Sequence, residues 1–231
     1  MFNNFGKQLY DNIIAGDRYM LYFRGLGRSM YITLGALLLG VLLGCIVAIV
    51  KVYVRDYKAL RPVSWVCDCY VTLIRGTPMT VQLLIIYFIV FATAPISAGL
   101  YIAMFAFGLN SGAYVSEIVR GGILSVDIGQ TEAGRSLGLT SNQTMWHIVL
   151  PQAVKTILPS LGNEMIVLFK ETAIVGYIAI QDLTKAADLI RSRTFSPVPL
   201  LVAAVMYLAV VMLMTWGLNT LERRLAKSDR R

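Results

Sequence analysis

The sequence predicts an all-α integral membrane protein with about five transmembrane helices. Of its 231 residues, 57% are hydrophobic and 15% are charged, and the mean hydropathy is +0.66, whereas soluble domains contain roughly 25% charged residues. The net charge of +8 comes from basic residues that flank apolar runs, an arrangement that orients a chain in a lipid bilayer. We therefore expect membrane lipid as a partner and no nucleic acid.

Residues 1–25 are predicted to form a separate amphipathic segment at the membrane interface. Apolar residues recur about every fourth position among polar ones, at Phe2, Phe5, Leu9, Ile13 and Ile14, as an interfacial helix arranges them. No basic region followed by a small-residue cleavage site is visible in the sequence. We therefore expect no removable signal peptide.

The first span is predicted over residues 29–50, which carry no charge and are long enough for one crossing. Small residues recur every fourth position within it, a pattern that allows a second helix to approach closely. They are Ala36, Gly40, Gly44 and Ala48. A short basic loop with Lys51, Arg55, Lys58 and Arg61 follows and ends at Pro62.

Two more spans are predicted in the uncharged run 76–116, which is too long for one crossing and turns at 94–97. Residues 63–74 are apolar except for Asp68, and we expect them to form a tilted or interfacial lead into the second span. Thr77 is predicted to cap the helix and Pro78 to take its first position. The third span contains a small-residue stripe (Gly108, Gly112, Ser116) and polar residues expected to face a cavity or another helix, namely Asn110, Ser111, Tyr114 and Glu117.

Residues 130–153 form the longest polar interval of the chain, and they predict two short helices that meet at a glycine. Thr131 is predicted to cap the first helix, and Gly138 suits the left-handed position that ends it. Thr140 or Ser141 starts the second helix, which is expected to stop before Pro151. Met145, Ile148 and Val149 share one face of that helix.

This interval resembles the loop signature of the membrane subunits of bacterial ABC importers. The matching pattern is Glu132-Ala133-Gly134, three residues, Gly138, nine residues, Ile148, one residue, and Leu150-Pro151. The resemblance implies that loop 129–153 holds a coupling helix seated in a cleft of an ATPase subunit. The implied contact residues are Glu132, Ala133, Gly134, Gly138, Leu150 and Pro151. Gly134 departs from the usual alanine, which costs the helix roughly 1 kcal/mol, and the alternative is an unrelated helix-turn-helix.

The remaining chain is predicted to contain two spans and one surface helix. Residues 156–180 form a span that Pro159 and Gly162 interrupt, with Glu164 pointing into the protein. Residues 181–193 form the surface helix, 200–221 the last span and 223–231 a basic tail. Residues 26–222 thus form the predicted transmembrane domain.

Three short motifs resemble the polar amino acid branch of the same importer family. They are Arg75-Gly76-Thr77-Pro78 with Gln82, Asn163-Glu164 and Lys170-Glu171-Thr172. The resemblance implies a type I ABC importer permease fold in a bacterial inner membrane, and a second permease subunit that is either identical or different. It also implies an extracytoplasmic substrate-binding protein and an ATPase that carries ATP and Mg, so no cofactor is expected in this chain. The same resemblance implies that Glu164 meets the substrate ammonium. Further candidate substrate contacts are Gln82, Asn110, Tyr114 and Glu117. For Glu117 the alternative is pairing inside the protein with Arg75, Arg120 or Lys170, of which Arg120 lies one helical turn away.

The distribution of basic residues predicts the orientation. With the coupling loop in the cytoplasm, the inside segments carry twelve Lys and Arg residues and the outside segments carry eight. The positive-inside rule then places the amino terminus outside and the carboxyl terminus inside.

No enzyme chemistry is predicted for this chain. The sequence has no phosphate-binding Gly-x4-Gly-Lys-Ser/Thr motif, so a partner must hydrolyse ATP. His147, the single histidine, has no Cys or Glu neighbour at the spacing of metal ligands. The three cysteines, Cys45, Cys67 and Cys69, predict neither a disulfide framework nor a metal site. We expect a translocation subunit of an ATP-driven importer for cationic or zwitterionic amino acids. The alternatives are a channel or scaffold without ATP coupling, and a permease for another small solute.

Overall fold

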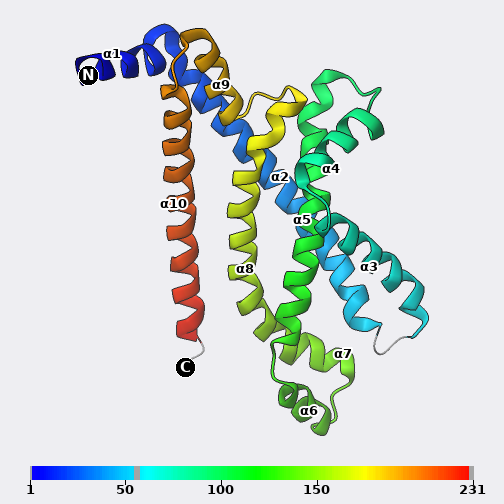
Figure 1. The fold of residues 1–231 in the computed structure, drawn as a ribbon. Helices are drawn as coiled ribbons and strands as arrows, with labels where there is room; N and C mark the ends of the chain where they lie inside the picture. The colour runs from blue at the N-terminus through cyan, green and yellow to red at the C-terminus, as the bar shows by residue number, and fades with distance from the viewer. Residues whose placement is uncertain (1, 55–57, 229–231) are drawn as a thin grey trace.

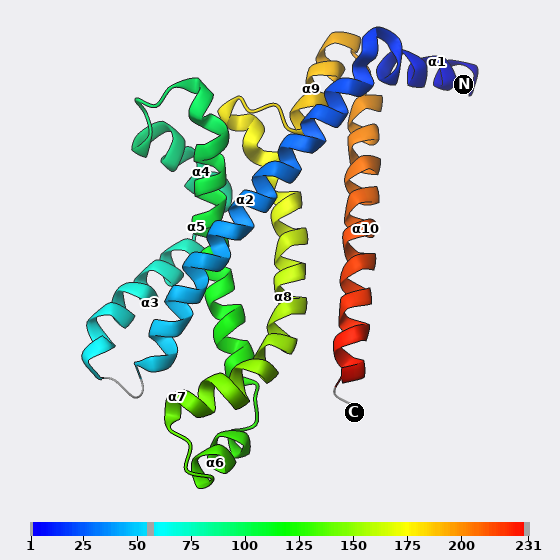
Figure 2. The ribbon, with the colours of Figure 1, turned by 180° about the vertical axis from the view of Figure 1, so that it is seen from behind.

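The computed structural model describes residues 2–54 and 58–228, and every regular element in these residues is a helix (Figures 1 and 2). The α-helices are α1 (Phe2–Ile13), α2 (Arg18–Tyr53), α3 (Arg61–Arg75), α4 (Met79–Ile85), α5 (Gly99–Leu124), α6 (Ile128–Ser136), α7 (Ser141–Thr144), α8 (Leu150–Glu171), α9 (Leu183–Thr194) and α10 (Val198–Ser228). The predicted basic residues Arg55, Arg230 and Arg231 lie outside the described residues, as do the side chains of Phe2, Phe5 and Lys227.

The amino-terminal helix α1 ends at Ile13, twelve residues before the predicted boundary at residue 25, and it extends sideways from the end of α10 (Figure 1). A turn with positive φ at Gly16 and Asp17 separates it from α2. The helix α2 contains 36 residues and begins well before the predicted span 29–50. Its first part is held against α9, because Gly25 lies so close that an added Cβ would stand 2.6 Å from the Asp182 carbonyl oxygen. Arg28 also donates to the Gln181 carbonyl at 3.1 Å.

The two predicted small-residue stripes lie in the most extensive helix contact of the described residues, between α2 and α5. An added Cβ at Gly40 would stand 2.7 Å from Ser111, and one at Gly44 would stand 2.7 Å from Val115. From the other side, a Cβ at Gly108 would stand 2.8 Å from Leu39. Glycine at these positions lets the two backbones approach, since a membrane helix pair is stabilised mainly by such close packing.

The second crossing begins with a tilted lead, as predicted for residues 63–74, and its second part is helical only over residues 79–90. The helices α3 and α4 meet at a bend of 108°, and the π-helix Ile86–Val90 continues α4. Thr77 does not cap α4: its hydroxyl donates to the Leu73 carbonyl at the end of α3, at 2.8 Å. Pro78 is extended (ψ 137°) and precedes α4, so it does not take the first helical position. We call residues 73–78 the elbow.

The helix α8 also differs from its prediction, because Pro159 and Gly162 do not interrupt it. It runs unbroken through both residues and changes to a 3-10 helix only at Thr172–Ile178. Proline is tolerated inside a membrane helix when neighbouring groups replace the lost hydrogen bond. Gly162 faces α10, where an added Cβ would stand 2.4 Å from Leu218, so this glycine permits close packing.

The predicted surface helix, α9, is exposed on one side only. It buries Leu183, Ala186, Ala187 and Ile190 and packs against α2 and α10. Asp182 caps it by accepting hydrogen bonds from the N–H groups of Thr184 and Lys185, both at 2.9 Å. The polar pattern that predicted a surface position therefore describes only the outer face.

Within the described residues, three segments are long and apolar enough to cross a membrane: Ala15–Tyr53, Ile96–Leu124 and Val198–Leu225. The bent pair Lys58–Arg75 and Met79–Val90 adds a fourth if it is one span. The more polar α8 lies along α5 in both views and takes the place of the remaining predicted crossing (Figures 1 and 2). The two termini lie at opposite ends, with α6 and α7 at the end of the carboxyl terminus.

Candidate functional site

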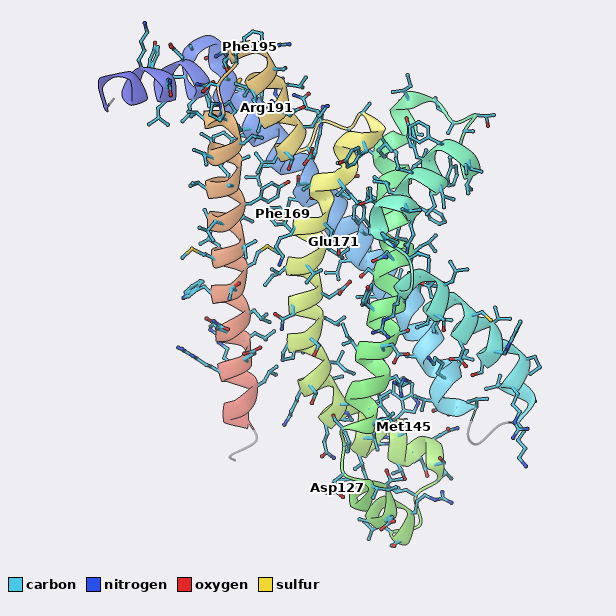
Figure 3. The ribbon with its side chains drawn as sticks, viewed as in Figure 1. Asp127, Met145, Phe169, Glu171, Arg191 and Phe195 are labelled. Carbon is cyan, nitrogen blue, oxygen red and sulfur yellow. The ribbon has the colours of Figure 1, made fainter. Side chains whose placement is uncertain are left out.

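The coupling loop projects from one end of the helical bundle, where Figure 3 labels Asp127 and Met145. Its first helix, α6, begins at Ile128, because Asp127 caps it by accepting from the Gly129 N–H at 2.6 Å. The predicted cap at Thr131 is therefore wrong, since an earlier residue already supplies the capping oxygen. Gly138 has a φ of +84°, which confirms the predicted left-handed turn.

The second loop helix starts as predicted but does not end as predicted. Thr140 caps α7 in a reciprocal capping box with Gln143. Instead of stopping before Pro151, the helix continues through the π-helix Met145–Val149 into α8. The Leu150 N–H donates to the Met145 carbonyl, five residues back. Pro151, which has no N–H to donate, lies in the first turn of α8.

Gly134 departs from the usual loop signature for a steric reason. It is buried, and an added Cβ would stand 2.8 Å from Ile148 and 2.9 Å from Thr144. The two loop helices therefore pack closely at Gly134, and an alanine there would have to displace the ends of the Ile148 and Thr144 side chains. Around this contact Val149 is buried and Met145 and Ile148 are half-buried, as the shared face predicted.

The outer surface of the coupling loop combines exposed apolar and polar side chains. Leu137 is 82% exposed and Trp146 is 67% exposed. Of the predicted ATPase contacts, Leu150 is half-buried and Gly134 is buried, while Glu132, Ala133, Gly138 and Pro151 are exposed. Apolar groups exposed beyond the membrane spans are typical of a protein interface.

Two hydrogen-bonded side-chain amides link the elbow to α5. The Asn110 amide donates to the Gln82 carbonyl oxygen at 3.0 Å. The Gln82 amide in turn donates to the carbonyls of Ile74 and Thr77, at 2.7 and 3.0 Å. Gln82 and Asn110 are both buried, so two of the candidate substrate residues hold the elbow against α5.

Glu164 is 9% exposed and faces α5 from α8. Ser111 donates a hydrogen bond to its carboxylate at 2.9 Å. Among the described residues no cationic side chain forms an ion pair with Glu164. An ionisable side chain buried within a membrane-spanning bundle marks a candidate functional site.

Glu117, in contrast, is fully engaged inside the protein. Arg120 donates to one carboxylate oxygen at 2.6 Å, which confirms the predicted local pairing. Lys51 binds the other oxygen at 2.8 Å and also reaches Asp68 at 3.0 Å. These four residues, Lys51, Asp68, Glu117 and Arg120, form what we call the ionic cluster, which joins α2, α3 and α5.

A family model described as "Binding-protein-dependent transport system inner membrane component" matches residues 40–227. The chain belongs to this family. The resemblance noted from the coupling loop is thereby confirmed.

Two relatives of this inner membrane component come from Bacillus subtilis (strain 168). The arginine transport system permease protein ArtQ is 36% identical over 211 residues, which cover 89% of this chain and 92% of ArtQ. The L-cystine transport system permease protein TcyB is 37% identical over 202 residues, covering 87% of this chain and 86% of TcyB. Both cover nearly the full length of each protein.

Solved structures confirm the type I ABC importer permease fold of this inner membrane component. A crystal structure described as an amino acid ABC transporter with histidines matches with a TM-score of 0.82 and 40% identity, covering 89% of this chain and 94% of that one. An inward-facing structure of the MetNI methionine ABC transporter matches with a TM-score of 0.74 at 17% identity. It covers 92% of this chain and 99% of that one, and at this identity it supports the fold alone.

Two residues of the site make contacts that local sequence patterns do not predict. Lys51 was placed in a basic loop, but it lies at the end of α2 and pairs with Glu117, 66 residues away. Arg75 lies at the elbow with its guanidinium carbon 5.3 Å from the ring centroid of Tyr114. Tyr114, the remaining candidate substrate residue, is 38% exposed.

Proposed function

We propose that this chain forms the translocation pathway of an ATP-driven importer for cationic or zwitterionic amino acids. It pairs with a second permease subunit, and a separate ATPase supplies ATP and Mg at the coupling loop. An extracytoplasmic binding protein delivers the substrate. The names of the relatives, which refer to arginine and cystine transport, support this substrate class.

The observation that carries the proposal is the environment of Glu164. Its carboxylate lies at membrane depth, 9% exposed, with Ser111 as its hydrogen-bond donor and no ion-pair partner among the described residues. An ionised carboxylate in a span costs roughly 2.5 kcal/mol or more unless a cation or a polar cavity compensates. The ammonium group of an amino acid supplies such a cation. Glu117 is excluded from this role because Lys51 and Arg120 already neutralise it.

The test is uptake by the complete importer reconstituted in vesicles. The variant Glu164→Gln is expected to lower the apparent affinity for the amino acid about tenfold, which corresponds to about 1.4 kcal/mol for one charge-assisted hydrogen bond. The matched control is Glu222→Gln, the same chemical change at an exposed position of α10, which should leave uptake unchanged. Basal ATP hydrolysis should be the same in both variants.

Three results would contradict the proposal. Unchanged uptake kinetics in Glu164→Gln would remove this carboxylate from the pathway. Failure of an ATPase subunit to copurify with the chain would favour a channel or scaffold, and a preference for anionic substrates would argue against the electrostatic reasoning.

The same proposal places the amino terminus outside and the coupling loop in the cytoplasm. A cysteine at Ser141, which is exposed in α7, should react with a membrane-impermeant thiol reagent only after the cytoplasmic face is opened. The three native cysteines are replaced beforehand. Labelling of this cysteine in intact cells would show that the chain has the opposite orientation.

A further inference from the structure

Arg75 occupies an unusual place for a cation, at the elbow in the middle of a membrane crossing. It is the last residue of α3, and the chain bends by 108° before α4 begins. Its guanidinium lies over the ring of Tyr114, which is about two helical turns or more from either end of α5. The cation is therefore held at the depth of the bilayer interior.

Hydrogen bonds fix the backbone on both sides of Arg75. Thr77 donates to the Leu73 carbonyl at 2.8 Å, and the Gln82 amide donates to the carbonyls of Ile74 and Thr77. Asn110 then ties Gln82 to α5. A non-helical backbone at membrane depth occurs where it is buried in protein or lines a water-filled cavity. The elbow combines both: Gln82 is buried beneath it, while Arg75 is exposed.

The charge of Arg75 is not neutralised within the described part of the chain. Glu117 and Asp68 are bound by Lys51, and Glu164 accepts from Ser111. The guanidinium has five N–H donors, and none has an oxygen acceptor among the described residues. An arginine at the centre of a span costs about 2.5 to 3.5 kcal/mol on insertion scales, so this position favours an anionic ligand.

We propose that Arg75 binds the α-carboxylate of the transported amino acid. The planar guanidinium pairs with a carboxylate through two parallel hydrogen bonds, and the Tyr114 ring supports the cation without supplying an oxygen acceptor. Every amino acid carries an α-carboxylate whatever its side chain, so Arg75 serves recognition of the class, while Glu164 serves the cationic group. This inference rests on the function proposed above.

The test measures binding to the complete complex of permease and ATPase subunits in lipid nanodiscs, without the binding protein. The probes are radiolabelled L-arginine and L-glutamine, each displaced by its unlabelled α-amide, in which a neutral amide replaces the carboxylate. In the parent complex the amino acid should bind better than its amide. Arg75→Gln should weaken binding of the amino acid about tenfold and change binding of the amide less than threefold, so that the preference is lost.

Two further variants separate recognition from a structural role. Arg75→Lys keeps the charge but loses the two-bond geometry, so it should retain part of the preference. Arg193→Gln removes an exposed arginine of α9 and should behave as the parent. Size-exclusion chromatography with the ATPase subunit verifies assembly of each variant.

Three outcomes would overturn the inference. Equal loss of amino acid and amide binding in Arg75→Gln would indicate a structural role, and an unchanged preference would exclude contact with the carboxylate. Loss of the assembled complex in both Arg75→Gln and Arg75→Lys would assign Arg75 to a contact between subunits. If the variants give one of these results although the parent importer takes up amino acids in vesicles, only this inference is refuted. A parent importer that takes up no amino acid refutes the proposed function.

Discussion

The ionic cluster allows a quantitative prediction, because its members differ in exposure. The side chains of Lys51 and Glu117 are 15% and 20% exposed, whereas that of Asp68 is 55% exposed. In Glu117→Gln, Lys51 keeps only its exposed partner and Arg120 loses its carboxylate. Removing one partner of a fully buried ion pair costs about 3 to 5 kcal/mol. Because these groups retain some contact with solvent, we expect about 2 kcal/mol.

The matched variant Asp68→Asn removes the exposed carboxylate and leaves the Lys51–Glu117 pair at 2.8 Å intact. An exposed ion pair contributes about 0 to 1 kcal/mol, so we expect about 0.5 kcal/mol. A double variant, Lys51→Met with Glu117→Met, removes the buried charges together and should recover much of the loss. Arg120, 37% exposed, can then be hydrated.

The assay is thermal unfolding of the purified complex at a fixed scan rate, followed by intrinsic tryptophan fluorescence. About 2 kcal/mol corresponds to a decrease in Tm of roughly 4 to 8 °C for a chain of this size, against about 2 °C or less for Asp68→Asn. If Glu117→Gln and Asp68→Asn lower Tm equally, the reasoning from burial is refuted. If the double variant is less stable than the single variants Lys51→Met and Glu117→Met, the assumed desolvation cost is refuted.

Two glycine substitutions give further predictions. Gly138 has open space around it, so Gly138→Val acts through the backbone alone and costs about 1 to 2 kcal/mol. Substrate-stimulated ATP hydrolysis should fall in this variant, whereas Gly138→Asn, which tolerates positive φ, should retain most of it. Equal activity of the two variants would contradict the role of the turn. Gly44→Leu would force α2 away from Val115, since its Cβ alone would stand at 2.7 Å, and should abolish the monodisperse complex in size-exclusion chromatography. Gly121→Leu, on α5 with no atom within 4 Å of its Cβ, should preserve the complex, and failure of this contrast would refute the packing argument.

The sequence predicts those parts of the fold that depend on neighbouring residues. The capping box of Thr140 and Gln143 and the left-handed Gly138 are local devices, and both are confirmed. The pair Glu117–Arg120 lies on one helix face three residues apart, so it too could be predicted. The stripes on α2 and α5 predicted a close helix contact because their period matches one helix face.

Features that depend on distant contacts could not be predicted. The bend at residues 73–78 is held by Gln82 of α4, which donates to the Ile74 and Thr77 carbonyls, and by Asn110 of α5, which donates to the side-chain oxygen of Gln82. No local pattern encodes these contacts. Pro159 was expected to break α8, but local propensity is overridden where the surrounding helices support the span. The pairing of Lys51 with Glu117 likewise joins two helices, so the sequence did not show that this cation neutralises Glu117, one of the candidate substrate residues.

The continuous helix from α7 through the π-helix Met145–Val149 into α8 has a mechanical consequence. No flexible linker separates the proposed ATPase contact from Glu164, which lies fourteen residues beyond Leu150. At 1.5 Å per residue this is about 21 Å along the helix axis, so a tilt of about 10° at the coupling loop displaces the carboxylate by about 4 Å. That displacement exceeds the length of a hydrogen bond. A small movement of the loop is therefore enough to exchange the Ser111 contact of Glu164 for another one.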